Sequence, residues 1–223
     1  MLKTNSDLPR TIGILLHPTA LPNSSICGTF GASSRSWLHL LAENGIGVWQ
    51  FLPLCPPDSS GSPYSSPSAF ALNPWFLDAD DLVEDGFLSE SDLLELRGSL
   101  QVESVSLDFS LASKRSLKIG SFLKNGWANQ TSQRHSEFED WSSKQDWLED
   151  YVCFTELRRQ FGELPWWEWP PGLAQHDATI LNDWKSSWED NLLEHRLIQW
   201  HLDRQWQAIR QTARNLGVLL FGD

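Results

Sequence analysis

The sequence predicts an α/β protein, organised either as the start of an α/β barrel or as a doubly wound sheet. Three short segments, Thr11–Leu16, Val48–Leu52 and Val218–Phe221, are nearly continuous apolar runs. Such runs are typical of parallel strands that are covered on both faces. Helical patterns lie before the second and the third run, and a large insertion separates these two runs. The order strand, helix, strand, insertion, helix, strand fits both architectures.

The first helix is predicted between the first two strands. Ser33 or Ser34 can cap its N-terminus, because a serine hydroxyl accepts a hydrogen bond from the first free backbone N–H groups. Gly45 is placed to end it. Apolar residues recur between these signals at steps of three and four, namely Trp37, Leu38, Leu41 and Ala42. The spacing predicts one apolar helix face.

The insertion, residues 78–190, is predicted to consist of acidic, tryptophan-rich helical pieces. Ser89 heads one helix, whose apolar residues are Leu93, Leu94 and Leu96. A second helix covers Trp147–Phe161, with Leu148, Tyr151, Val152, Phe154 and Leu157 on its apolar side. The proline-rich stretch Pro165–Pro171 is expected to interrupt helical structure.

A longer helix is predicted from Leu192 to Leu216, directly before the third strand. Its apolar positions advance in steps of mostly three and four: Leu193, Leu197, Trp200, Leu202, Trp206, Ile209, Ala213 and Leu216. Gly217 follows and is expected to end the helix.

The charge balance and the cysteines limit the classes of partner and compartment. The chain has 29 acidic and 17 basic residues, a formal net charge of −12, which argues against a nucleic-acid partner. Apolar runs are too short to span a bilayer, and residues 1–7 lack the apolar core of a signal peptide. Three scattered cysteines, Cys27, Cys55 and Cys153, indicate reduced thiols. We therefore expect a cytoplasmic protein without a membrane or nucleic-acid partner.

No cofactor and no metal site are expected. The run Asp78–Asp85 contains four aspartates and a glutamate, which could suggest calcium. It lacks the glycine-containing ligand spacing of a calcium loop, so we interpret it as a solvated turn and a helix start.

The candidate site is the loop 52–74, which follows the carboxyl end of the second strand, the edge where ligand loops gather in barrels and wound sheets. Six prolines, at 53, 56, 57, 63, 67 and 74, stiffen the loop and hold Ser62, Tyr64 and Ser68 in place. A tyrosine held in this way offers a ring face and a hydroxyl, which suit a glucose unit. The loop alone equally allows a tyrosine that packs beneath it.

In collinear blocks, the sequence resembles glycoside hydrolase family 77. The blocks are Gly13–Pro22 (GILLHPTALP), Trp49–Leu54 (WQFLPL), Ser62–Tyr64 (SPY), Ser68–Pro74 (SAFALNP), Trp147–Tyr151 (WLEDY), Leu164–Pro170 (LPWWEWP), Gln199–Trp200, Gln205–Trp206 and Gly222–Asp223. Each block alone is weak, but their shared order makes the resemblance strong.

The resemblance implies an incomplete (β/α)8 TIM barrel, with the first three strands and a large helical insertion between strands 2 and 3. Residues 1–77 would hold two strands and the substrate loop, 78–190 the insertion, and 191–223 barrel helix 2 and strand 3. It also implies a 4-α-glucanotransferase of starch and glycogen metabolism. Such an enzyme moves a segment of an α-1,4-glucan to a 4-hydroxyl of another glucan, a maltooligosaccharide or glucose, by a retaining mechanism with two carboxyl groups.

The resemblance assigns no catalytic residue to this chain, because the family's catalytic carboxylates lie on later strands. It assigns substrate contacts to Ser62, Pro63 and Tyr64, and support of the donor-sugar site to Asp223. His17 could reach the same site. Trp166, Trp167 and Trp169 could form a secondary glucan surface, although packing between helices is the stronger expectation.

The first hypothesis is therefore an enzyme truncated after its third strand and inactive alone. The alternatives are a non-catalytic glucan-binding or interaction module, and a helical adaptor. Truncation is expected to leave apolar strand residues without partners and to give a molten or aggregated species. These residues are Ile12, Ile14, Trp49, Phe51, Leu219 and Phe221.

Overall fold

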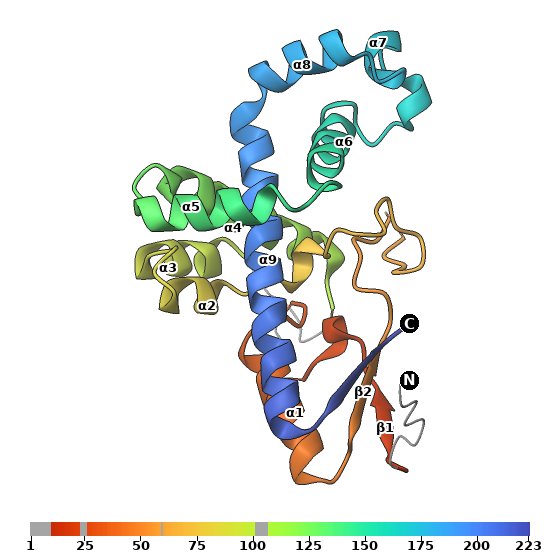
Figure 1. The fold of residues 1–223 in the computed structure, drawn as a ribbon, viewed down its shortest axis with the longest axis vertical. Helices are drawn as coiled ribbons and strands as arrows, with labels where there is room; N and C mark the ends of the chain where they lie inside the picture. Colours follow the sequence, from red (N-terminus) through yellow and green to blue (C-terminus); the bar gives the residue numbers. More distant parts are fainter. Residues whose placement is uncertain (1–9, 23–25, 59, 101–106) are drawn as a thin grey trace, which may run out of the picture.

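The sheet of the protein has three parallel strands in the order β1, β2, β3. The computed structural model describes residues 10–22, 26–58, 60–100 and 107–223, so the segment used to judge a signal peptide lies outside it. The strands are β1 (Gly13–Leu15), β2 (Val48–Phe51) and β3 (Leu219–Gly222). β1 and β2 lie inside their predicted runs, and β3 is shifted by one residue from its run. Figure 1 shows the three strands side by side. The α/β class is thereby confirmed.

Among the described residues, helices cover one face of this sheet and leave the other open (Figure 1). Trp49 and Phe51 point to that face and are buried in the core formed with α1 (Ala32–Glu43) and α9 (Glu189–Leu216). On the other face Leu15, Leu219 and Phe221 are 54%, 48% and 58% exposed. The expectation of strands covered on both faces is therefore wrong for the described chain. The expected lack of partners holds for the exposed Ile12, Leu219 and Phe221. It is wrong for Trp49 and Phe51, which are buried, and for Ile14, which packs against the core.

The first helix begins earlier than the serine cap predicted. Its N-cap is Gly31, and the hydroxyls of Ser33 and Ser34 instead donate to the carbonyl of Thr29, at 3.4 and 2.5 Å. Gly31 is needed there because a Cβ would lie 2.1 Å from the Asp78 carboxylate. A tertiary contact, rather than a local cap, thus sets the start of α1. Its end is as predicted, since Gly45 follows it with φ of +69°.

The insertion is helical throughout most of its length. Ser89 caps α3 with a capping box to Asp92, as its place in the sequence predicted, and α6 lies inside the predicted range. The helices are α2 (Ala79–Glu84), α3 (Glu90–Ser99), α4 (Phe109–Trp127), α5 (Ser132–Ser142), α6 (Leu148–Gln160), α7 (Pro171–Ala174) and α8 (Ala178–Ser187). The described residues also form three short 3-10 turns: η1 (Pro18–Ala20), η2 (Pro74–Phe76) and η3 (Trp166–Glu168). Helices α2 to α5 stack beside the middle of α9, and α6 to α8 lie around its far end (Figure 1).

The long helix α9 joins the sheet to the insertion. Its apolar face packs against α1 at one end and against α4 and α6 further along, with Leu197, Leu202 and Ile209 fully buried. Gly120 of α4 allows this approach, since a Cβ there would meet Ile198 at 2.6 Å. Gly217, with φ of +69°, ends α9 as predicted. None of the described helices, α9 included, is long and apolar enough to cross a membrane.

Candidate functional site

The loop after β2 is closed at its base and tied to α9. The backbone N–H of Asn73 donates to the carbonyl of Leu54 at 2.8 Å, which joins the two ends of the loop. The side-chain amide of Gln199 then brackets Leu72: its oxygen accepts from the Leu72 N–H at 2.9 Å, and its nitrogen donates to the Leu72 carbonyl at 2.8 Å. These bonds position the loop relative to the helix that precedes β3.

Short-range hydrogen bonds brace the tip of the loop. The Asp58 N–H donates to the Ser65 carbonyl at 2.8 Å, and the Asp58 carboxylate accepts from both the N–H and the hydroxyl of Ser60. These bonds from Ser60 lower the pKa of Asp58. Gly61 has φ of +76°, and a Cβ there would lie 2.3 Å from the Phe109 ring. Thus the loop owes its shape to these contacts as well as to its prolines.

The tip presents Tyr64 to the end of β3. The Tyr64 hydroxyl donates to the Asp223 carboxylate at 2.5 Å, so the structure brings together two of the predicted site residues. Tyr64 is 64% exposed, which excludes a tyrosine packed beneath the loop. Ser62 and Pro63 are half-buried next to it, and the Ser62 hydroxyl accepts from the Tyr64 N–H at 3.3 Å. The bond to Asp223 raises the pKa of Tyr64, so the phenol stays protonated at neutral pH.

This pair can bind an uncharged polar ligand. The exposed Tyr64 ring offers a flat apolar face, and its oxygen keeps a free lone pair. The second oxygen of Asp223 is an acceptor for a hydroxyl donor. A sugar ring has both complementary features, namely an apolar face of C–H groups and a rim of hydroxyls.

His17 is half-buried and packs against the core of the protein. Its ring meets the Phe76 ring edge-on at 5.6 Å, and its Nδ1 is buried without a hydrogen-bond partner within the described residues. Burial lowers the pKa of His17 to about 4, so the imidazole is neutral at pH 7. His17 thus packs against Phe76, and its contact with a sugar stays a prediction.

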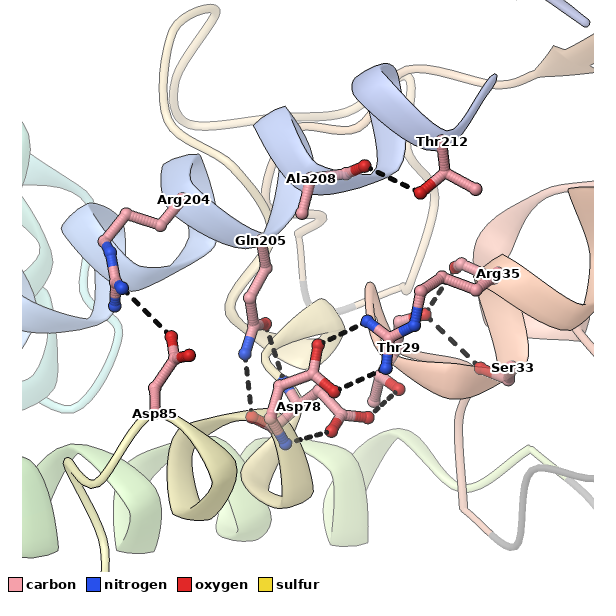
Figure 2. A network of polar contacts seen from close by, with 11 residues as sticks. Thr29, Ser33, Arg35, Asp78, Asp85, Arg204, Gln205, Ala208 and Thr212 are labelled. Atoms are coloured by element: carbon pink, nitrogen blue, oxygen red, sulfur yellow. Dashed lines mark hydrogen bonds and ion pairs between the residues drawn. The ribbon is translucent and has the colours of Figure 1, made fainter. Parts of the chain in front are cut away.

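The acidic run Asp78–Asp85 is part of a structural network (Figure 2). Asp78 caps α2 and accepts from the Thr29 hydroxyl at 2.5 Å, while Asp81 forms a bidentate ion pair with Arg35 at 2.6 and 2.7 Å. Burial raises the pKa of Asp78. The predicted helix start is correct, but the predicted solvation is wrong for these two half-buried carboxylates. Within the described ranges, no cluster of His, Cys, Asp and Glu side chains fits a metal ion.

Two glutamines of α9 are structural contacts of the site that the sequence analysis did not assign. Gln205 brackets Asp78 as Gln199 brackets Leu72, with bonds of 3.0 and 2.8 Å to the Asp78 N–H and carbonyl. Figure 2 shows this second clamp. Both glutamines are buried on the apolar face of α9. The sequence did contain a signal for them. In each Gln-Trp pair, the glutamine occupies a helix position where the pattern calls for an apolar residue, and a buried polar side chain needs a hydrogen-bond partner.

The tryptophans after α6 divide into two groups. Trp169 is buried against Phe154 and Phe161, as expected for packing between helices. Trp166 and Trp167 are exposed, so the packing expectation is wrong for these two. They meet edge to face at 5.7 Å on the surface.

Comparison with known proteins gives a consistent picture. A family model described as 4-alpha-glucanotransferase matches residues 16–223. The chain is 34% identical over 217 residues to the 4-alpha-glucanotransferase of Thermus thermophilus, covering 97% of this chain and 42% of that protein. It is 31% identical over 214 residues to the enzyme of the same name from Synechocystis, covering 96% and 42%. The chain thus spans about 42% of the length of these two relatives.

The fold also has a counterpart among solved structures. The amylomaltase from Streptococcus agalactiae, solved in complex with acarbose, superposes with a TM-score of 0.88 at 24% identity. The match covers 96% of this chain and 43% of that one. It supports the arrangement of three parallel strands and surrounding helices.

Proposed function

The chain belongs to the 4-alpha-glucanotransferase family, glycoside hydrolase family 77, and on that basis we propose that it supplies residues that line the donor-sugar site of a glucan-transferring enzyme. In this proposal the complete enzyme moves a segment of an α-1,4-glucan to a 4-hydroxyl of another glucan, a maltooligosaccharide or glucose. The chain is the N-terminal part, and carboxyl groups downstream of it perform the bond exchange. The protein works in the cytoplasm.

The observation that carries the proposal is the hydrogen bond between Tyr64 and Asp223. The two residues come from the carboxyl ends of neighbouring parallel strands, the edge where barrel enzymes place their ligand loops. Both are exposed at that edge. The rigid loop around Tyr64 holds the ring in place before substrate arrives, which reduces the entropy lost on binding.

The same proposal assigns the architecture. The three strands are the first three of a (β/α)8 barrel, 78–190 is a helical insertion between strands 2 and 3, and α9 is barrel helix 2. Support comes from the parallel order β1, β2, β3 and from the helices on one face only. The open face, with Leu15, Leu219 and Phe221, would then be the barrel interior.

The test compares the chain alone with the chain supplied with the downstream part of the enzyme, in the same polypeptide or as a separate piece. Alone, it should release neither glucose nor longer maltooligosaccharides from maltotriose, because retaining transfer requires both carboxyl groups. With the downstream part, transfer should appear. Transfer by the purified chain alone would contradict the proposal.

Tyr64→Ala then tests the site in the restored enzyme. The ring and its hydroxyl together are worth about 1–3 kcal/mol, so transfer efficiency should fall by about tenfold to a hundredfold. Leu94→Ala, on α3 and exposed, is the matched control and should leave efficiency per folded molecule unchanged. Full efficiency of Tyr64→Ala per folded enzyme would show that the loop is only structural.

A further inference from the structure

The two residues of the candidate site are held by segments that both attach to α9. Asp223 follows β3, which begins shortly after Gly217 ends α9. The Val218 N–H donates to the Ala213 carbonyl at 2.9 Å, and the Asp223 N–H donates to the Phe51 carbonyl at 3.2 Å. The end of α9 and the end of β2 therefore fix the position of Asp223.

The tip that carries Tyr64 depends on the limb of the loop that returns from it. Bonds within the tip join its own residues, such as the bond from the Ser65 N–H to the Ser62 carbonyl at 3.2 Å. The tip also meets the Phe109 ring at Gly61. These contacts fix the shape of the tip and support one side of it. The returning limb, residues 65–73, ties the loop to the helix that precedes β3.

Gln199 of α9 makes that connection. Its side chain is 2% exposed, and both ends of its amide are used on Leu72, at 2.9 Å from the N–H and 2.8 Å from the carbonyl. Two bonds to the same residue fix both the distance and the rotation of the backbone at this point. A buried amide with both ends satisfied is also costly to displace.

Hydrogen bonds continue from this bracket toward Tyr64. The Ala71 N–H donates to the Ser68 hydroxyl at 3.1 Å, and the Ser66 hydroxyl donates to the Ser68 carbonyl at 2.6 Å. Ala71 is itself buried, at 1% exposure. The limb between Leu72 and Tyr64 is thus braced along its length, so a displacement at Leu72 is passed on to the tip.

Gln205 makes the same kind of bracket with a different target. It binds the N–H and the carbonyl of Asp78 at 3.0 and 2.8 Å, and Asp78 caps α2 (Figure 2). Its bracket therefore ties the start of the insertion to α9, beyond the returning limb. The two glutamines have matching chemistry on one helix, and only Gln199 holds the loop of Tyr64.

We propose that Gln199 is a positioning residue for glucan transfer, which acts by setting where Tyr64 stands opposite Asp223. It connects the substrate loop to the helix that carries β3, so both members of the pair are placed by α9. A sugar-binding group held in place before substrate arrives loses less entropy on binding. The role in transfer rests on the proposed function, whereas the hold on Tyr64 can be measured without transfer.

The enzyme restored with its downstream part tests the role in transfer. Gln199→Leu should lower transfer efficiency per folded molecule by about three- to tenfold, a part of the effect expected for Tyr64→Ala. Gln205→Leu, the matched variant, should lower it by less. In the Tyr64→Ala background, adding Gln199→Leu should change efficiency by less than about twofold, because the group that it positions is gone. Losses that multiply in the double variant, or an equal loss in Gln205→Leu, would overturn the assignment.

Gln199→Glu is a second variant of nearly the same size, for use if the leucine variant does not fold. An ionised glutamate accepts from the Leu72 N–H but cannot donate to its carbonyl, whereas a protonated carboxyl does both, as the amide does. Burial favours the protonated form. Efficiency relative to the wild type at the same pH should therefore be low near pH 8 and rise toward about pH 5.5. A ratio that does not rise would count against the role.

Titration of Tyr64 in the 223-residue chain alone measures the hold on the loop directly. The chain has two tyrosines, and burial raises the pKa of Tyr151 to about 12, so Tyr64 ionises first. Its bond to Asp223 raises the pKa of Tyr64, so Gln199→Leu should lower that pKa toward the ordinary value of about 10. Ultraviolet difference absorbance follows the ionisation, and Tyr64→Phe identifies the signal.

Gln205→Leu is again the control and should leave the Tyr64 pKa as in the wild type. An unchanged Tyr64 pKa in folded Gln199→Leu, checked by far-ultraviolet dichroism, would overturn the positioning role. If the restored wild-type enzyme fails to transfer glucan, the proposed function is wrong, and this titration still decides whether Gln199 holds Tyr64 against Asp223.

Discussion

His201 is a buried histidine whose surroundings suppress its charge. It is buried in α9 between the Phe87 and Trp200 rings, whose centroids lie 4.4 and 4.7 Å from its own. Nδ1 lies 3.1 Å from the Arg204 guanidinium and must accept, because arginine only donates. The proton is therefore on Nε2, which has no partner among the described residues. Burial first, then Arg204 and Arg134, lowers the pKa of His201 well below its ordinary value.

The free energy of unfolding should therefore fall as the pH drops below about 6.5. The unfolded chain binds a proton at His201 near that pH whereas the folded chain does not, so folding loses up to about 1.4 kcal/mol per pH unit. Urea unfolding at pH 7.5 and 5.5 measures this difference. His201→Leu should reduce it, whereas the exposed control His39→Gln should not. An equal pH dependence in wild type and His201→Leu would contradict the assignment.

Among the helices, local signals predicted some ends well and one start badly. Gly45, Ser89 and Gly217 act through their own backbone or side chain, so their places in the sequence were sufficient. The start of α1 depends on the approach of Asp78 to Gly31, a contact between distant residues. Helix α4 was not predicted individually, although Ile119, Leu123 and Trp127 recur at steps of four. Its buried face also holds the small residues Ala112, Ser116 and Gly120, which weaken the apolar pattern.

The two glutamine clamps should contribute measurably to stability. Gln205→Leu keeps the size of the side chain but leaves the N–H and carbonyl of Asp78 without their partner. A cost of about 1–3 kcal/mol is expected for such unsatisfied buried groups. Chemical unfolding measures it, with the exposed Gln207→Leu of the same helix as control. A loss below about 0.5 kcal/mol, the size usual for a surface change, would mean that the clamp is dispensable.

At the scale of the whole molecule, the sequence predicted at which edge of the sheet the site lies. It did not predict the side-chain contacts that hold the site in place. Parallel strands end at the same edge, so the nearness of the loop after β2 to Asp223 followed from the strand order alone. The direct bond from Tyr64 to Asp223 and the hydrogen bonds of Gln199 and Gln205 depend on side-chain directions across more than a hundred residues. Periodicity contains no information on those directions.

The open face of the sheet determines how the 223-residue chain behaves alone. The helical core is closed, with Trp49 and Phe51 buried, so the chain should keep its helices and associate through the uncovered strands. Replacing both Leu219 and Phe221 by threonine keeps strand propensity and removes apolar surface. Sedimentation should then show more monomer than the wild type, while Leu94→Thr, an equally exposed change on α3, should have no such effect.

The same double variant distinguishes an incomplete barrel from an independent module. In a restored enzyme the face would be packed inside the barrel, so threonines there should lower the free energy of unfolding by a few kcal/mol, since each loses about 1.5–3 kcal/mol of apolar burial. In an independent module the face stays in water, and the stability of the two chains should be the same. A wild-type chain that is monomeric alone and unfolds in one sharp transition would favour the module, because no partner for Leu15, Leu219 and Phe221 would then be needed.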